Sequence, residues 1–250
     1  HRSGRYARTG RERLTVVRRV LGVAAIVVAV ILLVGAGAYK VMNSRTFQIT
    51  GELTARVDTT EKVVALTFDD GPTAADTEAI LGVLADHDVA ATFFVLGESV
   101  AADPVSARAI VAGGHQLANH SWDHPRLIFM GRDDIAAQIE QSDAALRAVG
   151  QDDPIVFRPP HGKKLIGLPR YLAEHDRHTI MWDVAVEDYS GGPAQSAVEL
   201  TELTLDSVQP GSIILLHPWN GRTATQQAIG LVITGLQQQG YRFVTVNDLL

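Results

Sequence analysis

The sequence predicts an α/β fold in which a parallel sheet closes, or nearly closes, into a barrel, with one membrane-spanning helix before it. From residue 63 onward, short apolar runs alternate with amphipathic stretches, and about seven or eight such units fit into roughly 190 residues. Residues 20–39 form an uncharged apolar run about 20 residues long, enough to cross a bilayer. In a barrel of this kind, ligand chemistry belongs at the C-terminal ends of the strands.

The predicted strands and helices alternate along the chain. The strands are short apolar runs at residues 63–68, 91–96, 116–118, 155–157, 179–182, 212–216 and 242–246. The helices are amphipathic stretches at residues 73–87, 104–112, 132–149, 168–175, 194–208 and 223–239. Residues 40–61 resemble a polar linker with one short strand near 47–49, and residues 62–250 are predicted to form the folded domain.

The N-terminal 45 residues differ in charge from the rest of the chain. They hold nine basic residues and one acidic residue, a balance of +8, whereas the remainder carries −14. Because arginines cluster before the apolar run, the positive-inside tendency places residues 1–19 in the cytoplasm, residues 20–39 in the cell membrane as an anchor, and the folded domain outside. Ala36-Gly37-Ala38 leaves cleavage of a signal peptide, and therefore secretion, as the alternative.

Charge and composition narrow the classes of partner. A folded domain this acidic argues against nucleic-acid binding and favours a neutral or cationic partner. The chain has no cysteine, so it has no disulfide framework, and any metal site must use His, Asp and Glu. The sequence leaves the oligomeric state open.

Two adjacent carboxylates close the first apolar run of the domain. Asp69 and Asp70 end the run, and Gly71-Pro72 forces a turn directly after them. Successive strand side chains point to opposite faces, so the two carboxylates converge on one site only if the strand breaks there. The pair therefore predicts two carboxylates with different roles.

Every other conspicuous polar cluster also follows a predicted strand. These clusters are Asn119 to His124, Arg158 to Gly162, Trp182-Asp183 and Leu215 to Pro218. Any one of them could be a surface loop or a satisfied core residue. Their joint occurrence at the C-terminal strand ends instead predicts one site at one rim of the barrel.

The residue types at this rim suit a divalent metal ion and hydrolysis. His120 and His124 are four residues apart and can face one ion, and Asp70 completes a set of two histidines and one carboxylate. Such a set leaves room for water, whose pKa falls towards 7 on zinc. Asp69 is then free to act as a base, with Arg158 keeping it ionised, and His217 can supply the acid.

Five motifs between Thr67 and Trp219 extend this interpretation to a family. The stretches TFDDGP, HSWDH, RPPHG, WDVAVEDY and LLHPW, in this order, resemble the motifs of the polysaccharide deacetylases, carbohydrate esterase family four, which share the NodB-homology domain. The resemblance spans about three quarters of the chain. It implies a distorted (β/α) barrel of about seven strands that removes N- or O-acetyl groups from glycans such as peptidoglycan, chitin oligomers or xylan. It also implies a divalent metal, usually Zn²⁺, with Co²⁺ or Mn²⁺ as alternatives.

The resemblance assigns roles to individual residues. It implies that Leu215 lines the pocket for the acetyl methyl group and that the backbone N–H near His161 stabilises the oxyanion. Trp182 and Tyr189 are placed in the substrate-binding pocket on the same grounds. It further implies that Asp69 is the general base, Arg158 is the partner of that base and His217 is the general acid. The implied metal ligands are Asp70, His120 and His124.

Three positions depart from the family pattern. His161 stands where Tyr or Phe is usual, and Tyr189 replaces a Trp. Ala185 occupies the position of the Asp that supports the acid histidine. Asp183, Glu187 and Asp188 are the candidates to take over that support, and the sequence does not choose among them.

The sequence therefore favours a metal-dependent hydrolase acting on acetylated cell-envelope glycan outside the membrane. A membrane-anchored glycan-binding protein with a decayed site is a second hypothesis, motivated by Ala185. A glycosidase in which Asp69 and another carboxylate act as a pair is a third, but such enzymes need no pair of histidines four residues apart.

Overall fold

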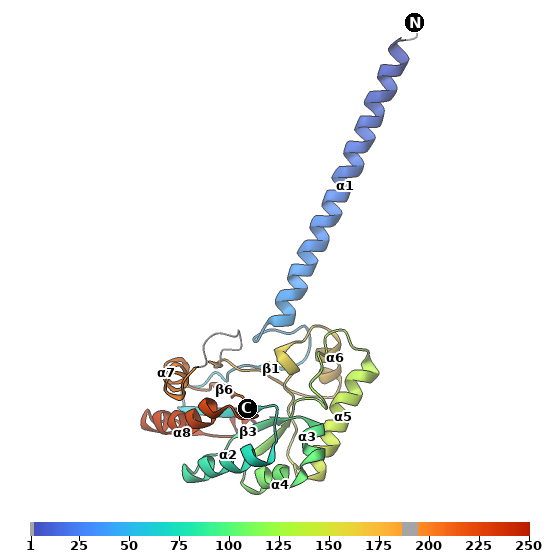
Figure 1. Ribbon diagram of the computed structural model, residues 1–250. Helices are drawn as coiled ribbons and strands as arrows, with labels where there is room; N and C mark the ends of the chain where they lie inside the picture. Colours follow the sequence, from blue (N-terminus) through green and yellow to red (C-terminus); the bar gives the residue numbers. More distant parts are fainter. Residues whose placement is uncertain (1–2, 187–194) are drawn as a thin grey trace. The chain divides into compact units, whose positions relative to one another are not determined.

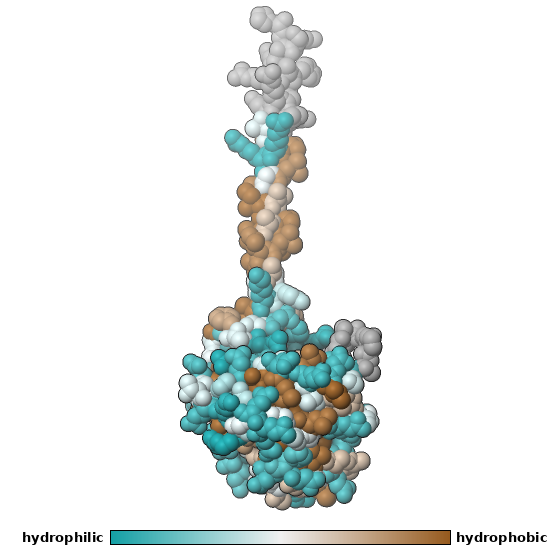
Figure 2. Space-filling model, turned by 90° about the vertical axis from the view of Figure 1, so that its left-hand side faces the viewer, coloured by the Kyte–Doolittle hydropathy of each residue, from teal (hydrophilic) through white to brown (hydrophobic). Residues whose placement is uncertain are grey.

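The computed structural model describes residues 3–186 and 195–250, with side chains from residue 15 onward. The chain divides into two units, residues 1–42 and 43–250. The first is helix α1 (Ser3–Asn43), whose stretch Thr15–Asn43 has a mean hydropathy of 2.9 in its most apolar window. Its large apolar side chains are exposed along the helix, and Figure 2 shows them on one face of it. By length and composition this helix could span a membrane, and a signal sequence has the same features.

The second unit is built on a parallel sheet with the strand order β4–β3–β2–β6 (Figure 1). Its central strand, β2 (Val63–Asp69), pairs on one side with β3 (Thr92–Val95) and on the other with β6 (Ile213–Leu216). At the outer side of β3 lies β4 (Gln116–Asn119). In this register Phe68 lies between Phe93 and Leu216.

Single bridges close the sheet into a ring. Asn119, at the end of β4, pairs with Phe157, which in turn pairs with Thr179 in β5 (Thr179–Ile180). The same segment continues to Val184, which pairs with Ile214 in β6. The backbone N–H of Leu215 donates to the carbonyl of Val184 at 2.9 Å. The ring of parallel segments is therefore complete but irregular, and this confirms the expected distorted (β/α) barrel.

Helices surround the ring (Figure 1). Six of them lie within three residues of the boundaries predicted from the sequence: α2 (Ala74–Asp86), α4 (Pro104–Ala112), α5 (Arg132–Ala148), α6 (Gly167–Glu174), α7 (Ala197–Ser207) and α8 (Thr223–Gln238). The sequence did not predict α3 (Gly97–Ala102), the short 3₁₀ helix η1 (Pro160–Gly162) or α9 (Val246–Leu249). A Cβ at Gly97 would lie 2.7 Å from the Ser142 backbone, so glycine allows α3 to approach α5 closely.

Several predicted strands are shorter than expected. The expected strand 155–157 is a single bridge at Phe157, and the strand at 242–246 shortens to β7 (Arg242–Phe243), which pairs with the start of β2. The short strand expected near residues 47–49 lies instead at β1 (Leu53–Thr54), paired with β5. Residues 43–61 belong to the second unit, and Ala55 is buried there. The domain boundary at residue 62 stays a prediction.

Alternation along β2 determines which side chains enter the barrel. Val64, Leu66 and Phe68 pack with the surrounding helices, whereas Val63 and Ala65 pack with apolar residues from the other barrel strands. Because strand side chains alternate, Thr67 and Asp69 share the inward face with Ala65. The sheet itself therefore directs the Asp69 carboxylate into the barrel.

A glycine at the start of β6 tests how firmly residues 43–61 pack on the barrel. Gly211 has φ +79°, and a Cβ there would lie 1.9 Å from the carbonyl oxygen of Val57. We expect Gly211→Ala to lower the free energy of unfolding by about 3 kcal/mol or more, since left-handed strain adds to a backbone clash. The control is Gly221→Ala, because Gly221 has φ +74° but open space around it. That variant should lose about 1 kcal/mol in chemical denaturation. Equal losses would contradict the packing described here.

Candidate active site

A cleft of about 560 Å³ opens where β2, β4 and β6 end. Each polar cluster that the sequence predicted at the strand ends has at least one residue that lines this cleft. The side chains that line it are Asp69, Asp70, His120, His124, His161, Gly162, Trp182, Ala185, Leu215, His217, Trp219, Asn220 and Arg222. Tyr189, which we expected in the substrate-binding pocket, lies outside the described residues.

Behind the cleft, Arg158 holds Asp69 in a buried ion pair. The guanidinium donates to Asp69 Oδ1 at 2.6 Å and to Thr67 Oγ1 at 2.8 Å. Its other nitrogens donate to the carbonyls of Ile180 and Met181, at 3.4 and 3.1 Å. Arg158 has no exposed surface and Asp69 has 2%. The charged carboxylate therefore has one fixed orientation, with Oδ2 directed towards His120 at 3.7 Å.

The backbone turns sharply between the two carboxylates. Asp69 is the last residue of β2, and Asp70 has a left-handed conformation with φ 84°. The alternation of side chains ends there, so Asp70 can face the same cleft as Asp69. Trp219 packs against the turn, since a Cβ at Gly71 would lie 2.3 Å from its ring, and its indole N–H donates to the carbonyl of Asp69.

The loop after β4 brings the two histidines to Asp70. His120 Nε2 lies 3.5 Å and His124 Nε2 lies 3.4 Å from Asp70 Oδ1. The loop is a tight turn rather than a helix: Ser121 and His124 have φ 74° and 63°, and the His124 N–H donates to Ser121 Oγ at 3.1 Å. This geometry explains how residues four apart in sequence converge on one point.

The donor set fits a metal ion. One ligand atom from each of Asp70, His120 and His124 lies within 4.8 Å of the other two. Asp70 Oδ1 is buried and, among the described residues, accepts no hydrogen bond. His120 Nδ1 lies 2.8 Å from the carbonyl of Arg158, which can only accept, so Nδ1 carries the proton and Nε2 presents its lone pair to the cleft.

Electrostatics keeps Asp70 and His124 in the protonation states that ligands need. Burial alone would raise the pKa of Asp70, but the neighbouring His120 and His124 outweigh it and hold that pKa below its usual range. Burial and the adjacent His120 lower the pKa of His124 to about 4, so its imidazole is neutral at pH 7. A carboxylate and a neutral imidazole are the forms that bind a divalent cation.

His161 lies beside this set but is not one of its three members. Its ring centroid is 4.4 Å from that of His124, and its backbone is left-handed with φ 57°. Burial lowers the pKa of His161, and the charge on Arg126 lowers it further. Trp182 packs over the next residue, because a Cβ at Gly162 would lie 2.8 Å from its ring.

His217 and Leu215 lie on the β6 side of the cleft. Ala185 lines the cleft with them. Asp183, one of the three candidates to support His217, does not face it: its carboxylate accepts from Ser212 Oγ at 2.7 Å and from the Ile213 N–H at 2.9 Å. Both carboxylate oxygens of Asp183 are therefore bonded to residues at the start of β6. Asp183 is not the carboxylate that supports His217. Glu187 and Asp188 lie outside the described residues.

Sequence reasoning missed four residues that the structure places at the site. Thr67 donates to the carbonyl of Ile214 at 2.7 Å and accepts from Arg158. Trp219, Asn220 and Arg222 line the cleft after β6. Inward alternation along β2 could have identified Thr67, and Trp219 stands in the last of the five motifs. Asn220 and Arg222 carry no sequence signal.

Comparison with known proteins agrees with this geometry. Residues 56–178 match the family model described as polysaccharide deacetylase. A peptidoglycan-N-acetylglucosamine deacetylase of Bacillus cereus is 35% identical over 188 residues, covering 74% of this chain and 67% of that protein. The deacetylase PgdA of Listeria monocytogenes is 36% identical over 196 residues, 76% of this chain, and the chain spans only 39% of its length.

Solved structures show the same relationship. A peptidoglycan N-acetylglucosamine deacetylase in complex with 4-naphthalen-1-yl-N-oxidanyl-benzamide superposes with a TM-score of 0.74 at 33% identity, covering 78% of this chain and 91% of that one. A family pseudoenzyme from Bacillus anthracis superposes with a TM-score of 0.69 at 27% identity, covering 81% and 69% of the two chains. The barrel, the site at its rim and these matches lead to one conclusion: the chain belongs to the polysaccharide deacetylase family.

Proposed function

We propose that this protein is a metal-dependent deacetylase that removes acetyl groups from peptidoglycan. One observation carries the proposal: the Asp70, His120 and His124 set lies directly beside a separate carboxylate, Asp69, that forms an ion pair with a buried arginine. In metal-dependent hydrolysis of an amide or ester, some side chains hold the metal ion and a different side chain transfers the proton. The names of the relatives point to N-acetylglucosamine or N-acetylmuramic acid units as the substrate.

Zinc is the proposed metal, with Co²⁺ or Mn²⁺ as alternatives. Two imidazole nitrogens and one carboxylate oxygen are a ligand set typical of catalytic zinc, with a position left for substrate. When bound, the ion would polarise the acetyl carbonyl and lower the pKa of water in the cleft. Asp70, His120 and His124 would hold it, and the hydrogen bond of His120 to the Arg158 carbonyl keeps that ring oriented.

Asp69 and His217 would perform the two proton transfers. Asp69 Oδ2 faces the cleft beside His120, whereas Oδ1 is bonded to Arg158, so Oδ2 is the atom that would take a proton from the attacking water. His217, directly after the neighbouring strand β6, would give a proton to the leaving nitrogen or oxygen. The backbone N–H near His161 would stabilise the oxyanion.

The remaining wall of the cleft would hold the sugar and its acetyl group. Leu215 is apolar and buried at 3% exposure, which suits the acetyl methyl group. Trp182 is half-buried in the wall and offers an aromatic face to a sugar ring. Tyr189 keeps its proposed place in the substrate pocket.

We also propose that residues 20–39, within the apolar stretch Thr15–Asn43, anchor the domain to the cell membrane, with the domain outside. The length and hydropathy of these residues suit a span, and the arginines before them suit a cytoplasmic flank. A peptidoglycan substrate requires an extracytoplasmic domain, and secretion after signal cleavage would satisfy that requirement too.

A second candidate function is glycan binding without catalysis. The structural similarity to a family pseudoenzyme favours it, as does Ala185 in place of a supporting Asp. Against it, Asp70, His120 and His124 lie close enough together to share one ion, and the proposed base, Asp69, is paired with Arg158. Turnover separates the two functions.

Mass spectrometry of peptidoglycan fragments and chitin oligomers should show the loss of acetyl groups after incubation with the metal-loaded protein. Release of acetate without new reducing ends would distinguish a deacetylase from a glycosidase. The matched control is His120→Ala, which should lose both activity and stoichiometric metal uptake. An active, metal-free His120→Ala protein would contradict the proposed metal site.

Asp69→Asn tests the division between the two carboxylates. The amide cannot accept a proton from water, so kcat should fall by ~10²–10⁴-fold. Metal content, measured by elemental analysis, should stay at the wild-type level. Should the variant lose its metal, Asp69 would be a ligand rather than the base.

Ala185→Asp tests the support of His217. A carboxylate here would favour the imidazolium, so the alkaline limb of the kcat/KM profile should move to higher pH. Ala185→Asn, similar in size but uncharged, is the control and should leave the limb in place. His217→Ala should lower turnover without removing metal. If the limb does not move with Asp, another carboxylate already supports the ring.

A further inference from the structure

The chain enters the catalytic unit at the wall of the cleft. Lys163 and Lys164 directly follow the cleft residues His161 and Gly162. The ammonium of Lys163 donates to Asn43 Oδ1, and the ammonium of Lys164 donates to the carbonyl of Ser44. The first two residues after Met42 are thus bonded to the loop that forms one side of the site.

Burial makes this attachment a firm one. Lys164 has no exposed surface, and burial lowers its pKa to about 8. A buried amine is costly unless it is hydrogen-bonded, and its bond to the Ser44 backbone meets that need. Releasing residues 43–44 from the loop would leave the amine without this partner.

The next residue reaches the cleft through one side chain. The guanidinium of Arg45 lies 5.9 Å from the ring centroid of Trp182, which lines the cleft. Arg158, the partner of Asp69, lies 5.6 Å from the same ring. Trp182 therefore stands between the chain entry point and the buried ion pair of the site.

If the anchor spans the membrane as proposed, this entry point limits how far the cleft can lie from the lipid. Four helical residues separate Tyr39, the end of the apolar run, from Asn43, a rise of about 6 Å. The head-group layer is itself about 5–8 Å thick. Two more residues to Arg45 add at most about 7 Å. The wall of the cleft therefore lies within roughly 20 Å of the head groups, whatever angle the two units make.

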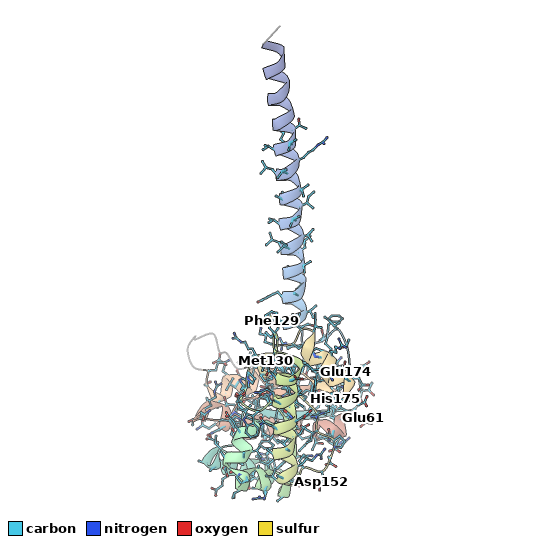
Figure 3. The ribbon with its side chains drawn as sticks, turned by 90° about the vertical axis from the view of Figure 1, so that its right-hand side faces the viewer. Glu61, Phe129, Met130, Asp152, Glu174 and His175 are labelled. Atoms are coloured by element: carbon cyan, nitrogen blue, oxygen red, sulfur yellow. The ribbon has the colours of Figure 1, made fainter. Side chains whose placement is uncertain are left out.

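The surface around the entry point suits an anionic membrane. Residues 43–250 are strongly acidic, yet Arg45 and Arg126 are exposed beside the cleft. Phe129 is 87% exposed and Ile166 is 58% exposed. The segments that carry them are neighbours, since a Cβ at Gly167 would lie 3.8 Å from the carbonyl oxygen of Met130. Figure 3 shows Phe129 and Met130 at the opposite end of the catalytic unit from Asp152. Exposed aromatic, aliphatic and basic side chains are typical of surfaces that contact lipid head groups.

We infer that the protein acts on acetylated glycan carried by a membrane lipid, at the membrane surface, rather than on the cross-linked wall farther out. The inference rests on the proposed deacetylase function and on the proposed anchor. The clamp of Lys163 and Lys164 on residues 43–44 keeps the cleft at the height of sugars attached to lipid.

The test moves the cleft away from the membrane by a known distance. An insert of 18 residues of EAAAK-type sequence between Tyr39 and Lys40 adds five helical turns, about 27 Å, and leaves residues 43–45 unchanged. The control carries the same insert between Arg13 and Leu14, on the cytoplasmic side. Both full-length proteins are placed in phosphatidylglycerol vesicles with an acetylated chitin oligomer coupled to lipid, or with the same oligomer free in solution.

We expect the outer insert to lower the rate on lipid-coupled oligomer at least ten-fold, with the rate on free oligomer unchanged within two-fold. The control should match wild type on both substrates. Equal rates on lipid-coupled oligomer for all three proteins would overturn the inference. Activity on neither substrate in wild type would instead refute the proposed deacetylase function.

A second measurement holds even if the insert damages the fold. The chain has no cysteine, so Ile166→Cys and Asp152→Cys each give one labelling site on the full-length protein. Energy transfer from a dye at residue 166 to a dye on the lipid head groups should exceed that from residue 152. Equal transfer, or stronger transfer from residue 152, would contradict a cleft held at the membrane surface.

Discussion

The buried ion pair between Arg158 and Asp69 is the constraint on which the rest of the site depends. Its guanidinium bonds to β2 through Thr67 and Asp69, and to the carbonyls of Ile180 in β5 and of Met181 directly after it, so it ties separate strands of the ring together. The carbonyl of Arg158 also orients His120. Removal of either charge would leave the other buried and unpaired, at a cost of several kcal/mol. One interaction thus fixes the orientation of the Asp69 carboxylate, aligns a histidine and ties separate strands of the irregular barrel together.

Around this pair, the functional side chains depend on unusual backbone conformations rather than on regular secondary structure. Asp70, Ser121, His124 and His161 all have φ between 57° and 84°, although none is glycine. Such conformations are unfavourable for L-residues and persist only where the surrounding structure enforces them. Here the turn at Gly71 is packed under Trp219, and the loop after β4 is held by its own hydrogen bonds. The cleft is therefore preorganised by the chain itself.

The connection between the two units adds a positional constraint to this chemistry. A long flexible linker would let a catalytic domain sample a wide volume, but residues 43 and 44 are hydrogen-bonded to the same loop that carries His161. The next residue, Arg45, lies beside the ring of Trp182, which forms part of the cleft wall.

The sequence by itself determined the α/β class, most of the helices and the three residues that we propose as metal ligands. Helix α4 has the predicted bounds, because hydrophobic periodicity and Pro104 are local signals. Asp70, His120 and His124 were recognisable because residue type and spacing are also local. Only the tertiary structure decided that Asp183 turns to Ser212 instead of His217, that Phe157 is a single bridge, and that residues 43–61 join the barrel. Those outcomes depend on residues far away in sequence that compete for the same hydrogen bonds and packing positions. A local sequence pattern contains no information about that competition.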